Sequence, residues 1–411
     1  MHKRRSLIMS VVLSVALVGA ACSSDDGGGS SSAPSTTEAP AAPADFSGRG
    51  PYAVGQVDLH LDDDHVVVVF YPVDADAVPE DAEAYSYSGP DVLAPEISAI
   101  LPGSLSGEVA PDNTWVGLPA SGAGPFPTVL HSHGFSGNAR FGNQHNAAVA
   151  SWGYVVAAVD HPERGLRAIL DNFISGEAGD AERPDEYLDS DQLIAAIDLL
   201  ANAGHDDASP LAGAVDAERV AAEGHSAGGS ASGTAAYDPR VDLWIGQAPG
   251  APLEPGADVD NLSGAALLGA TSPPGVPSLI IAAEGDTVIP LDRVQSIYDW
   301  LGSPKRFAVI AGSGHAVFVD PCVPIREEGG LSGFVAKLGL DPAEVPLVEL
   351  GENGCLPSDT DPQLVWGLIN HLTVAQLNEV FDVDAAVATA SLERSFLDAT
   401  FPELLKDLAV S

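Results

Sequence analysis

The sequence predicts an α/β fold in which a mostly parallel sheet is covered by helices on both faces. The first observation behind this prediction is that short apolar runs alternate along the chain with segments of helical apolar spacing. The second is that segments rich in glycine, histidine and acidic residues, at 133–138, 224–229 and 284–290, each follow such a run directly. Because ligand sites of open parallel sheets lie at the ends of the strands, these segments are expected to share one edge.

The apolar runs are the predicted strands, and the segments of helical spacing between them are the predicted helices. The run at 65–72 is rich in valine, which predicts a strand buried on both faces, and Pro72 is expected to end it. The predicted strands are 52–57, 65–72, 127–132, 154–159, 219–223, 242–247, 278–283 and, as the last strand, 305–310. The expected helices are 143–152, 187–203, a helix of small residues after 226, 293–301, 363–380 and 391–408.

Two stretches lack this periodicity and are expected to lie at the surface. Residues 73–124 are acidic and rich in proline and glycine, which predicts a long excursion before the core resumes. Residues 248–275 are rich in proline, glycine and small apolar residues. They predict either a lid or pocket wall, or an inert surface loop.

The chain is strongly acidic. It carries 17 lysines and arginines against 58 aspartates and glutamates, a formal net charge of −41 over 411 residues. Such a field repels nucleic acid and anionic membrane surfaces, so neither is an expected partner. The acidic residues are spread along the sequence, which favours a solvated acidic surface over a specific cation site.

The N-terminus has the pattern of an export signal. A basic cluster at 2–5 precedes an apolar run at 7–21, which is too short to span a bilayer comfortably and predicts a signal peptide over residues 1–21. The run ends at Cys22 in a segment that resembles a bacterial lipobox, with Gly19 where leucine is usual, so Cys22 is expected to carry a lipid anchor. The alternative is an ordinary secretory signal cut near Ala21. Residues 22–50 then predict a disordered linker, and the membrane is contacted only through the anchor.

Two cysteines remain when Cys22 is assigned to the anchor. Cys322 and Cys355 would lie together in an oxidising compartment, where a disulfide between them is expected. Two buried free thiols are the alternative.

Residues 219–229 carry the candidate nucleophile. A short apolar run ends in a G-x-S-x-G pentapeptide at 224–228, and small residues that could open a helix follow it. A serine at such a strand-to-helix turn has an exposed hydroxyl on a strained backbone, which makes Ser226 the predicted nucleophile. A glycine-rich loop before a helix is the alternative reading.

The turn after the 127–132 strand is the candidate oxyanion site. Ester hydrolysis passes through a tetrahedral oxyanion, and each preorganised backbone donor can contribute about 3 kcal/mol. The N–H groups of Phe135 and of Ala227 are the expected donors. A metal site at His131, His133 and the 160–161 pair is the rival interpretation. Alternation along a strand argues against it, because it sends the two imidazoles to opposite faces.

Serine, acid and histidine follow one another in chain order, each just past a predicted strand. Asp286 follows the 278–283 strand and His315 follows the 305–310 strand. His315 would take the proton of Ser226 while Asp286 orients the imidazole. A turn-capping aspartate and a surface histidine are the alternatives, and Glu284 is the reserve candidate for the acid. His225 is expected to be structural.

At these motifs the chain resembles the α/β hydrolases that include the platelet-activating-factor acetylhydrolases, the dienelactone-hydrolase-like proteins and, more distantly, cutinase-like polyester hydrolases. The resemblance rests on residues 51–55, 70–72, 131–135, 156–161, 224–229 and 286–290. It extends from residue 51 to about residue 315 and implies hydrolysis of an ester with a short or compact acyl group and no cofactor. The α/β-hydrolase domain is expected to span 51–411, without a metal site. The chain departs from the family in 73–124 and in a C-terminal extension from about residue 320.

The expected function is therefore that of an exported serine esterase acting on a neutral or zwitterionic, small or lipid-like carboxylic ester. A polyester hydrolase with an open groove is the alternative within the fold. A catalytically silent surface lipoprotein that binds a ligand at this site is the alternative from another class.

Overall fold

The computed structural model describes residues 41–61, 65–93, 99, 108–175, 186–254, 272–337, 339, 341–345 and 348–411. Residues 40–411 form one compact unit. The predicted signal peptide, Cys22, most of the linker and 255–271 of the candidate lid lie outside the described residues. Within the described ranges, no helix has both the length and the hydropathy that a membrane crossing requires.

The described residues form one sheet in the strand order β10-β9-β8-β7-β6-β4-β5-β2-β1-β3. The strands β4 to β9 pair with one another in parallel, whereas β2 pairs antiparallel with β1 and β5, and β10 pairs antiparallel with β9. The predicted mostly parallel sheet is therefore confirmed. The strands are β1 (Ala53–His60), β2 (Val66–Val73), β3 (Thr114–Val116), β4 (Phe126–Ser132), β5 (Val155–Val159), β6 (Val215–His225), β7 (Leu243–Gln247), β8 (Ser278–Ala283), β9 (Lys305–Ile310) and β10 (Leu405–Val410).

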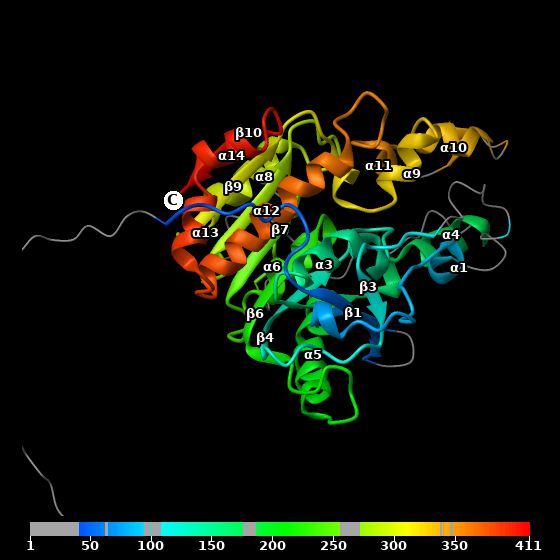
Figure 1. Ribbon diagram of the computed structural model, residues 1–411. Helices are drawn as coiled ribbons and strands as arrows, with labels where there is room; N and C mark the ends of the chain where they lie inside the picture. The colour runs from blue at the N-terminus through cyan, green and yellow to red at the C-terminus, as the bar shows by residue number, and fades with distance from the viewer. Residues whose placement is uncertain are drawn as a thin grey trace, which may run out of the picture. The chain divides into compact units, whose positions relative to one another are not determined.

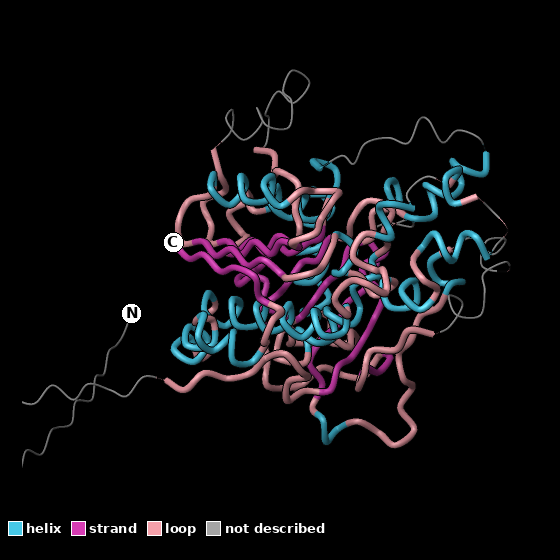
Figure 2. The backbone as a smooth tube through the Cα atoms, turned by 90° about the horizontal axis from the view of Figure 1, so that it is seen from above, coloured by secondary structure: helices cyan, strands magenta, loops and turns pink. Residues whose placement is uncertain are grey.

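Helices cover both faces of the sheet, as Figure 2 shows for the layer of strands between two layers of helices. Alternation along the strands supplies both cores: Val129 packs into the core under α3, α12, α13 and α14, and Leu130 into the core under α5, α6 and α8. The helices are α1 (Gly89–Val92), α3 (Asn143–Ala150), α4 (Leu166–Ser175), α5 (Glu186–His205), α6 (Ala227–Ala235), α8 (Leu291–Trp300), α9 (Cys322–Glu327), α10 (Leu331–Lys337), α11 (Val348–Glu352), α12 (Pro362–Val380), α13 (Ala385–Ser391) and α14 (Arg394–Thr400). The 3-10 helices are η1 (Ala75–Ala77), η2 (Ala139–Gly142), η3 (Pro162–Arg164), η5 (His315–Phe318) and η6 (Pro342–Glu344).

Two sequence-based expectations for the C-terminal region are wrong. Residues 391–408 do not form one helix, because α14 ends at Thr400 and Pro402 cannot continue it. The chain then forms β10, which pairs with β9, so 305–310 is not the last strand. The C-terminal extension is also part of the core, since α12 packs against β7 and β8 (Figure 1).

A smaller correction concerns Pro72, which lies inside β2 and does not end it. The pairing of β2 with β5 stops at Phe70, whereas its pairing with β1 runs on to Val73. Pro72 therefore lies beyond the β5 ladder, where its missing N–H removes no hydrogen bond to that strand. The 73–124 excursion likewise contributes a strand, because β3 pairs with β1.

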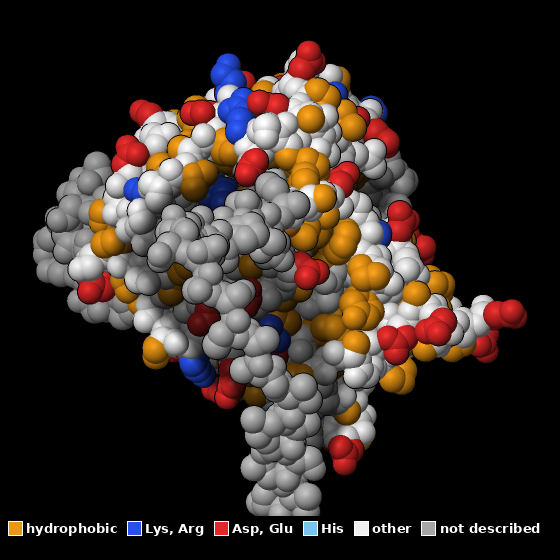
Figure 3. Space-filling model, turned by 60° about the vertical axis from the view of Figure 1, so that its left-hand side comes forward, with side chains coloured by type: hydrophobic (Ala, Val, Ile, Leu, Met, Phe, Trp, Pro, Cys, Tyr) orange, Lys and Arg blue, Asp and Glu red, His pale blue; other side chains and the backbone are white. Residues whose placement is uncertain are grey.

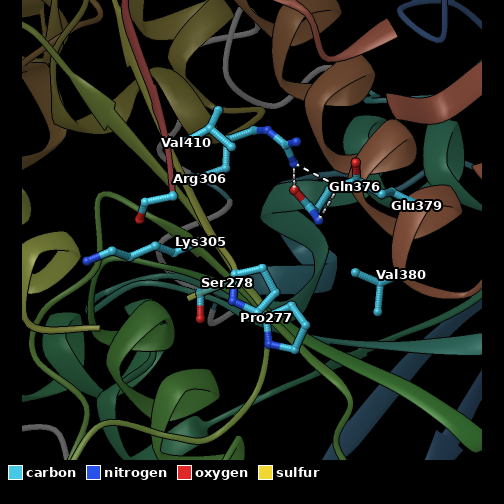
Figure 4. A pocket seen from close by; sticks show the side chains of 10 residues that line it. Pro277, Ser278, Lys305, Arg306, Gln376, Glu379, Val380 and Val410 are labelled. Atoms are coloured by element: carbon cyan, nitrogen blue, oxygen red, sulfur yellow. Dashed lines mark hydrogen bonds and ion pairs between the residues drawn. The ribbon is translucent and has the colours of Figure 1, made fainter. Parts of the chain in front are cut away.

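The surface agrees with the charge pattern of the sequence. On the face drawn in Figure 3, acidic side chains are scattered and do not gather in one patch. A hollow of about 380 Å³ opens where β8 and β9 begin, and Arg306, Gln376 and Val380 are among the residues that line it (Figure 4). The predicted catalytic segments follow the opposite, carboxyl ends of these strands, so the hollow is not the substrate site.

Candidate active site

Ser226 lies at the sharp turn between β6 and α6. Its backbone has φ 56° and ψ −119°, a conformation that costs a non-glycine residue free energy and is typical of functional sites. The flanking glycines permit this turn. A Cβ on Gly224 would lie 2.2 Å from the carbonyl oxygen of Gly228, and a Cβ on Gly228 would lie 2.1 Å from that of Ser132. Only glycine fits at both positions.

Two hydrogen bonds connect Ser226 to His315 and His315 to Asp286. His315 Nε2 lies 2.8 Å from Ser226 Oγ, and His315 Nδ1 lies 2.8 Å from Asp286 Oδ2. The second oxygen of Asp286 accepts the N–H groups of Val288 and Ile289, each at 2.8 Å. The three side chains are buried at the carboxyl edge of the sheet. A carboxylate at Nδ1 favours the tautomer that leaves Nε2 free to accept the serine proton.

The reserve acid lies elsewhere. Glu284 accepts the backbone N–H of Gly312 at 3.0 Å and pairs with Lys406 at 2.8 Å, at the surface. His225 turns away from the nucleophile: its Nε2 lies 2.9 Å from the carbonyl oxygen of His315, and its ring packs against Phe318. Burial, reinforced by the neighbouring His315, holds the pKa of His225 well below its ordinary range, so its ring is neutral.

The turn after β4 lies directly against the nucleophile. A Cβ on Gly134 would lie 3.4 Å from Ser226 Cβ. Among the described residues, no acceptor is within hydrogen-bonding distance of the N–H of Phe135 or of Ala227, whereas Gly137 N–H donates within the turn to Gly134. The N–H groups of Phe135 and Ala227, the predicted oxyanion donors, thus remain without a backbone acceptor among the described residues.

Arg164, which no sequence motif marks, supports this turn. Its guanidinium donates to the carbonyl oxygen of His133 at 2.6 Å and to Ser132 Oγ at 3.1 Å, and its own carbonyl oxygen accepts Ser136 N–H at 2.9 Å. Asp189, on α5, pairs with the guanidinium at 2.5 Å, and both side chains are only 3% exposed. One indication of this role was a charged residue just past the predicted 154–159 strand.

The histidines of the rival metal site face opposite sides of β4. The ring of His131 faces His145 at a centroid distance of 6.2 Å, and the ring of His133 faces His161 at 5.1 Å. Burial lowers the pKa of His131 to about 4. In the ranges that the structure describes, no group of three or more His, Cys, Asp or Glu side chains is arranged to hold a metal ion.

A disulfide joins Cys322 to Cys355, with the sulfurs 2.05 Å apart, so the predicted pairing is confirmed and the free-thiol alternative is wrong. Both cysteines are fully buried. The bridge lies close to the turn that carries His315, because Cys322 begins α9 shortly after η5 ends.

A mostly parallel sheet between two layers of helices, with a serine at the turn after β6, defines an α/β hydrolase. Residues 44–198 match the family model of platelet-activating factor acetylhydrolase, isoform II, and residues 178–322 match the PET hydrolase-like family model. Both families hydrolyse carboxylic esters with a serine nucleophile, so the predicted resemblance is confirmed and the chain is a serine ester hydrolase. A comparison with curated proteins finds no match.

Proposed function

We propose that the chain is an exported, lipid-anchored esterase that cleaves carboxylic esters of short or compact acyl groups, with Ser226, His315 and Asp286 as its catalytic triad. The observation that carries this proposal is the pair of 2.8 Å hydrogen bonds that joins the three side chains. A second support is the match of 44–198 to the acetylhydrolase family, whose name states removal of a small acyl group.

The geometry suits two-step acyl transfer. Ser226 Oγ attacks the carbonyl carbon as His315 Nε2 takes its proton, and the carbonyl oxygen becomes an oxyanion held by the N–H groups of Phe135 and Ala227. The C–O bond then breaks, and His315 returns the proton to the departing alcohol. A water molecule, deprotonated by His315, attacks the acyl-enzyme and releases the acid. Asp286 stabilises the imidazolium in both steps.

Initial rates on nitrophenyl esters from acetate to palmitate test this proposal. The wild type should prefer short esters, and Ser226→Ala should lower kcat/KM by at least ~1000-fold, because the nucleophile is gone. Ser296→Ala, an exposed serine on α8, is the matched control and should keep the wild-type rate. Equal rates of wild type and Ser226→Ala, with no labelling of either by a serine-reactive phosphonate, would favour the silent binding protein.

A polyester hydrolase is the second candidate. It is supported by the match to the PET hydrolase-like model over 178–322, a range that contains Ser226, Asp286 and His315. Release of soluble acid from an insoluble polyester film, at a rate per enzyme comparable with that on the soluble esters, would favour this candidate over the small-ester hydrolase.

Export and anchoring rest on the N-terminal pattern and on the buried disulfide, which suits an oxidising compartment. Cell fractionation of Cys22→Ala tests the anchor. The wild type should sediment with membranes, and the variant should be soluble, because it has no thiol to carry the lipid. If both proteins are released into the medium, the ordinary secretory signal is the correct reading.

A further inference from the structure

Asn353 connects the turn that holds Asp286 to the turn that holds His315. Its Oδ1 accepts the backbone N–H of His315 at 2.7 Å and that of Thr287 at 3.2 Å. Its Nδ2 donates to the carbonyl oxygen of Gly285 at 3.1 Å. One amide side chain therefore holds the backbone on both sides of the acid and at the histidine itself.

The backbone around Asn353 is also packed closely against the histidine turn. Its carbonyl oxygen accepts Ala316 N–H at 2.7 Å. The next residue, Gly354, lies so near Gly314 that a Cβ on Gly314 would be 2.6 Å from the nitrogen of Gly354. Such contact transmits any shift of the 353–355 segment to His315.

The disulfide fixes this segment in place. Cys355 lies just beyond Gly354, and its partner Cys322 begins α9 after the histidine turn. The helix that leads into Asn353, α11, packs against both η5 and α9, and Figure 1 shows α11 beside α9. The segment is thus held covalently to the chain that continues from His315.

We propose that Asn353 is a positioning residue that sets the carboxylate of Asp286 against the imidazole of His315, and that the Cys322–Cys355 disulfide holds Asn353 in that position. This inference rests on the proposed function, since it assumes that the two side chains are catalytic. Neither family match reaches residue 353, so Asn353 belongs to the C-terminal part of this chain, outside both matched ranges.

Asn353 is expected to affect the rate because the Asp286–His315 hydrogen bond tolerates little displacement of either residue. The two residues lie on separate loops, after β8 and after β9. The one direct backbone bond between those loops, among those found in the described residues, is Gly285 N–H to Ser313 at 2.8 Å. A shift of about 1 Å between catalytic groups can cost ~100-fold in rate. The amide of Asn353 adds three more hydrogen bonds across the same gap.

Kinetics of Asn353→Leu and Asn353→Asp test the inference. Leucine matches asparagine in size but accepts no hydrogen bond, so kcat should fall by about 10- to 100-fold while KM stays within about 2-fold. Aspartate keeps an oxygen for both N–H groups but loses the donor to the Gly285 carbonyl oxygen, so it should recover part of the lost kcat and remain faster than leucine. Asn353→Ala provides a second variant without an acceptor and should behave like leucine.

Glu352→Ala is the matched control. Glu352 precedes Asn353 and accepts two hydrogen bonds from Ser332, on α10, so its loss removes a contact of α11 while the hydrogen bonds of Asn353 and the disulfide stay in place. It should keep the wild-type kcat. If Glu352→Ala and Asn353→Leu lower kcat equally, or if aspartate is no better than leucine, Asn353 is merely structural and the inference is overturned.

The disulfide is tested by a double-mutant cycle. Replacing both Cys322 and Cys355 with alanine should lower kcat by about 10-fold, and adding Asn353→Leu should cost less than it does in the wild type, because both changes release the same turn. Fully additive losses would overturn the proposed role of the disulfide. The proposed esterase function is tested separately: it fails if Ser226→Ala keeps its activity, whatever the Asn353 variants do.

Discussion

His315→Ala is expected to lower kcat on a short nitrophenyl ester by about 10⁵-fold, a loss as large as the one expected from removing the Ser226 hydroxyl. The imidazole is the group within hydrogen-bonding distance of Ser226 Oγ in the structure, at 2.8 Å. Without it, the hydroxyl has no base for attack and the leaving alcohol has no acid. His205→Ala, at the exposed end of α5, is the control and should retain the wild-type rate.

The three side chains are expected to act as a unit. Ser226→Ala combined with His315→Ala should therefore be hardly slower than either single variant, because the remaining catalysis comes from substrate binding and the backbone donors. Asp286→Asn should cost about 10⁴-fold, since an amide can orient the imidazole in the wrong tautomer. A loss of less than 10-fold in His315→Ala would remove His315 from the mechanism, and a smaller loss in Asp286→Asn than in Glu284→Gln would reassign the acid.

The fold and the three hydrogen-bonded residues Ser226, His315 and Asp286 were predictable because a local sequence pattern marks each of them. An apolar run followed by a glycine-rich turn identifies Ser226, and the same logic places Asp286 and His315 after the next strands. Their meeting at one edge follows from the parallel arrangement of the strands. Glu284, the reserve acid on the same turn, was set aside only by the structure, where it pairs with Lys406 at the surface.

Residues that act through distant contacts were not predictable. Arg164 lies against the turn after β4 together with Asp189, which comes from α5, and Asn353 reaches His315 only because the chain returns there from α11. Neither residue forms part of a local motif. The missed β10 has a different cause: Pro402 was a visible helix breaker, but the apolar spacing of 391–408 favoured a helix across it.

The second large effect is expected on stability and comes from a buried cluster of polar side chains around Glu223. Glu223, on β6, is fully buried, and its Oε1 accepts Gln247 Nε2 at 2.7 Å and His145 Nε2 at 3.1 Å. His145 Nδ1 in turn lies 2.7 Å from Asn370 Oδ1. Both imidazole nitrogens face acceptors, which favours the imidazolium form. Contacts through Glu223 and His145 thus join β6, the strand that leads into Ser226, to β7, α3 and α12.

Burial opposes the charge on both partners, yet their mutual attraction and hydrogen bonds outweigh it. The attraction and the hydrogen bonds lower the pKa of Glu223 below its ordinary 4.5 and raise the pKa of His145 above its ordinary 6.5. The contribution of Glu223 to stability is present above pH 4.5 and is lost as the pH falls through its folded pKa. The contribution of His145 is present below pH 6.5 and is lost as the pH rises through its folded pKa. The pair therefore stabilises the fold most between these values.

Glu223→Gln is expected to lower the free energy of unfolding by about 3 kcal/mol near pH 5.5, because it leaves a buried imidazolium without its counter-charge. Denaturant unfolding of wild type and variant between pH 4 and 9 measures the difference, which should shrink on both sides of that window. Adding His145→Gln should restore part of the stability, since it removes the uncompensated charge. A difference that is small and independent of pH would mean that the two groups are neutral in the folded protein and that the anchoring of the Ser226 strand depends on hydrogen bonds alone.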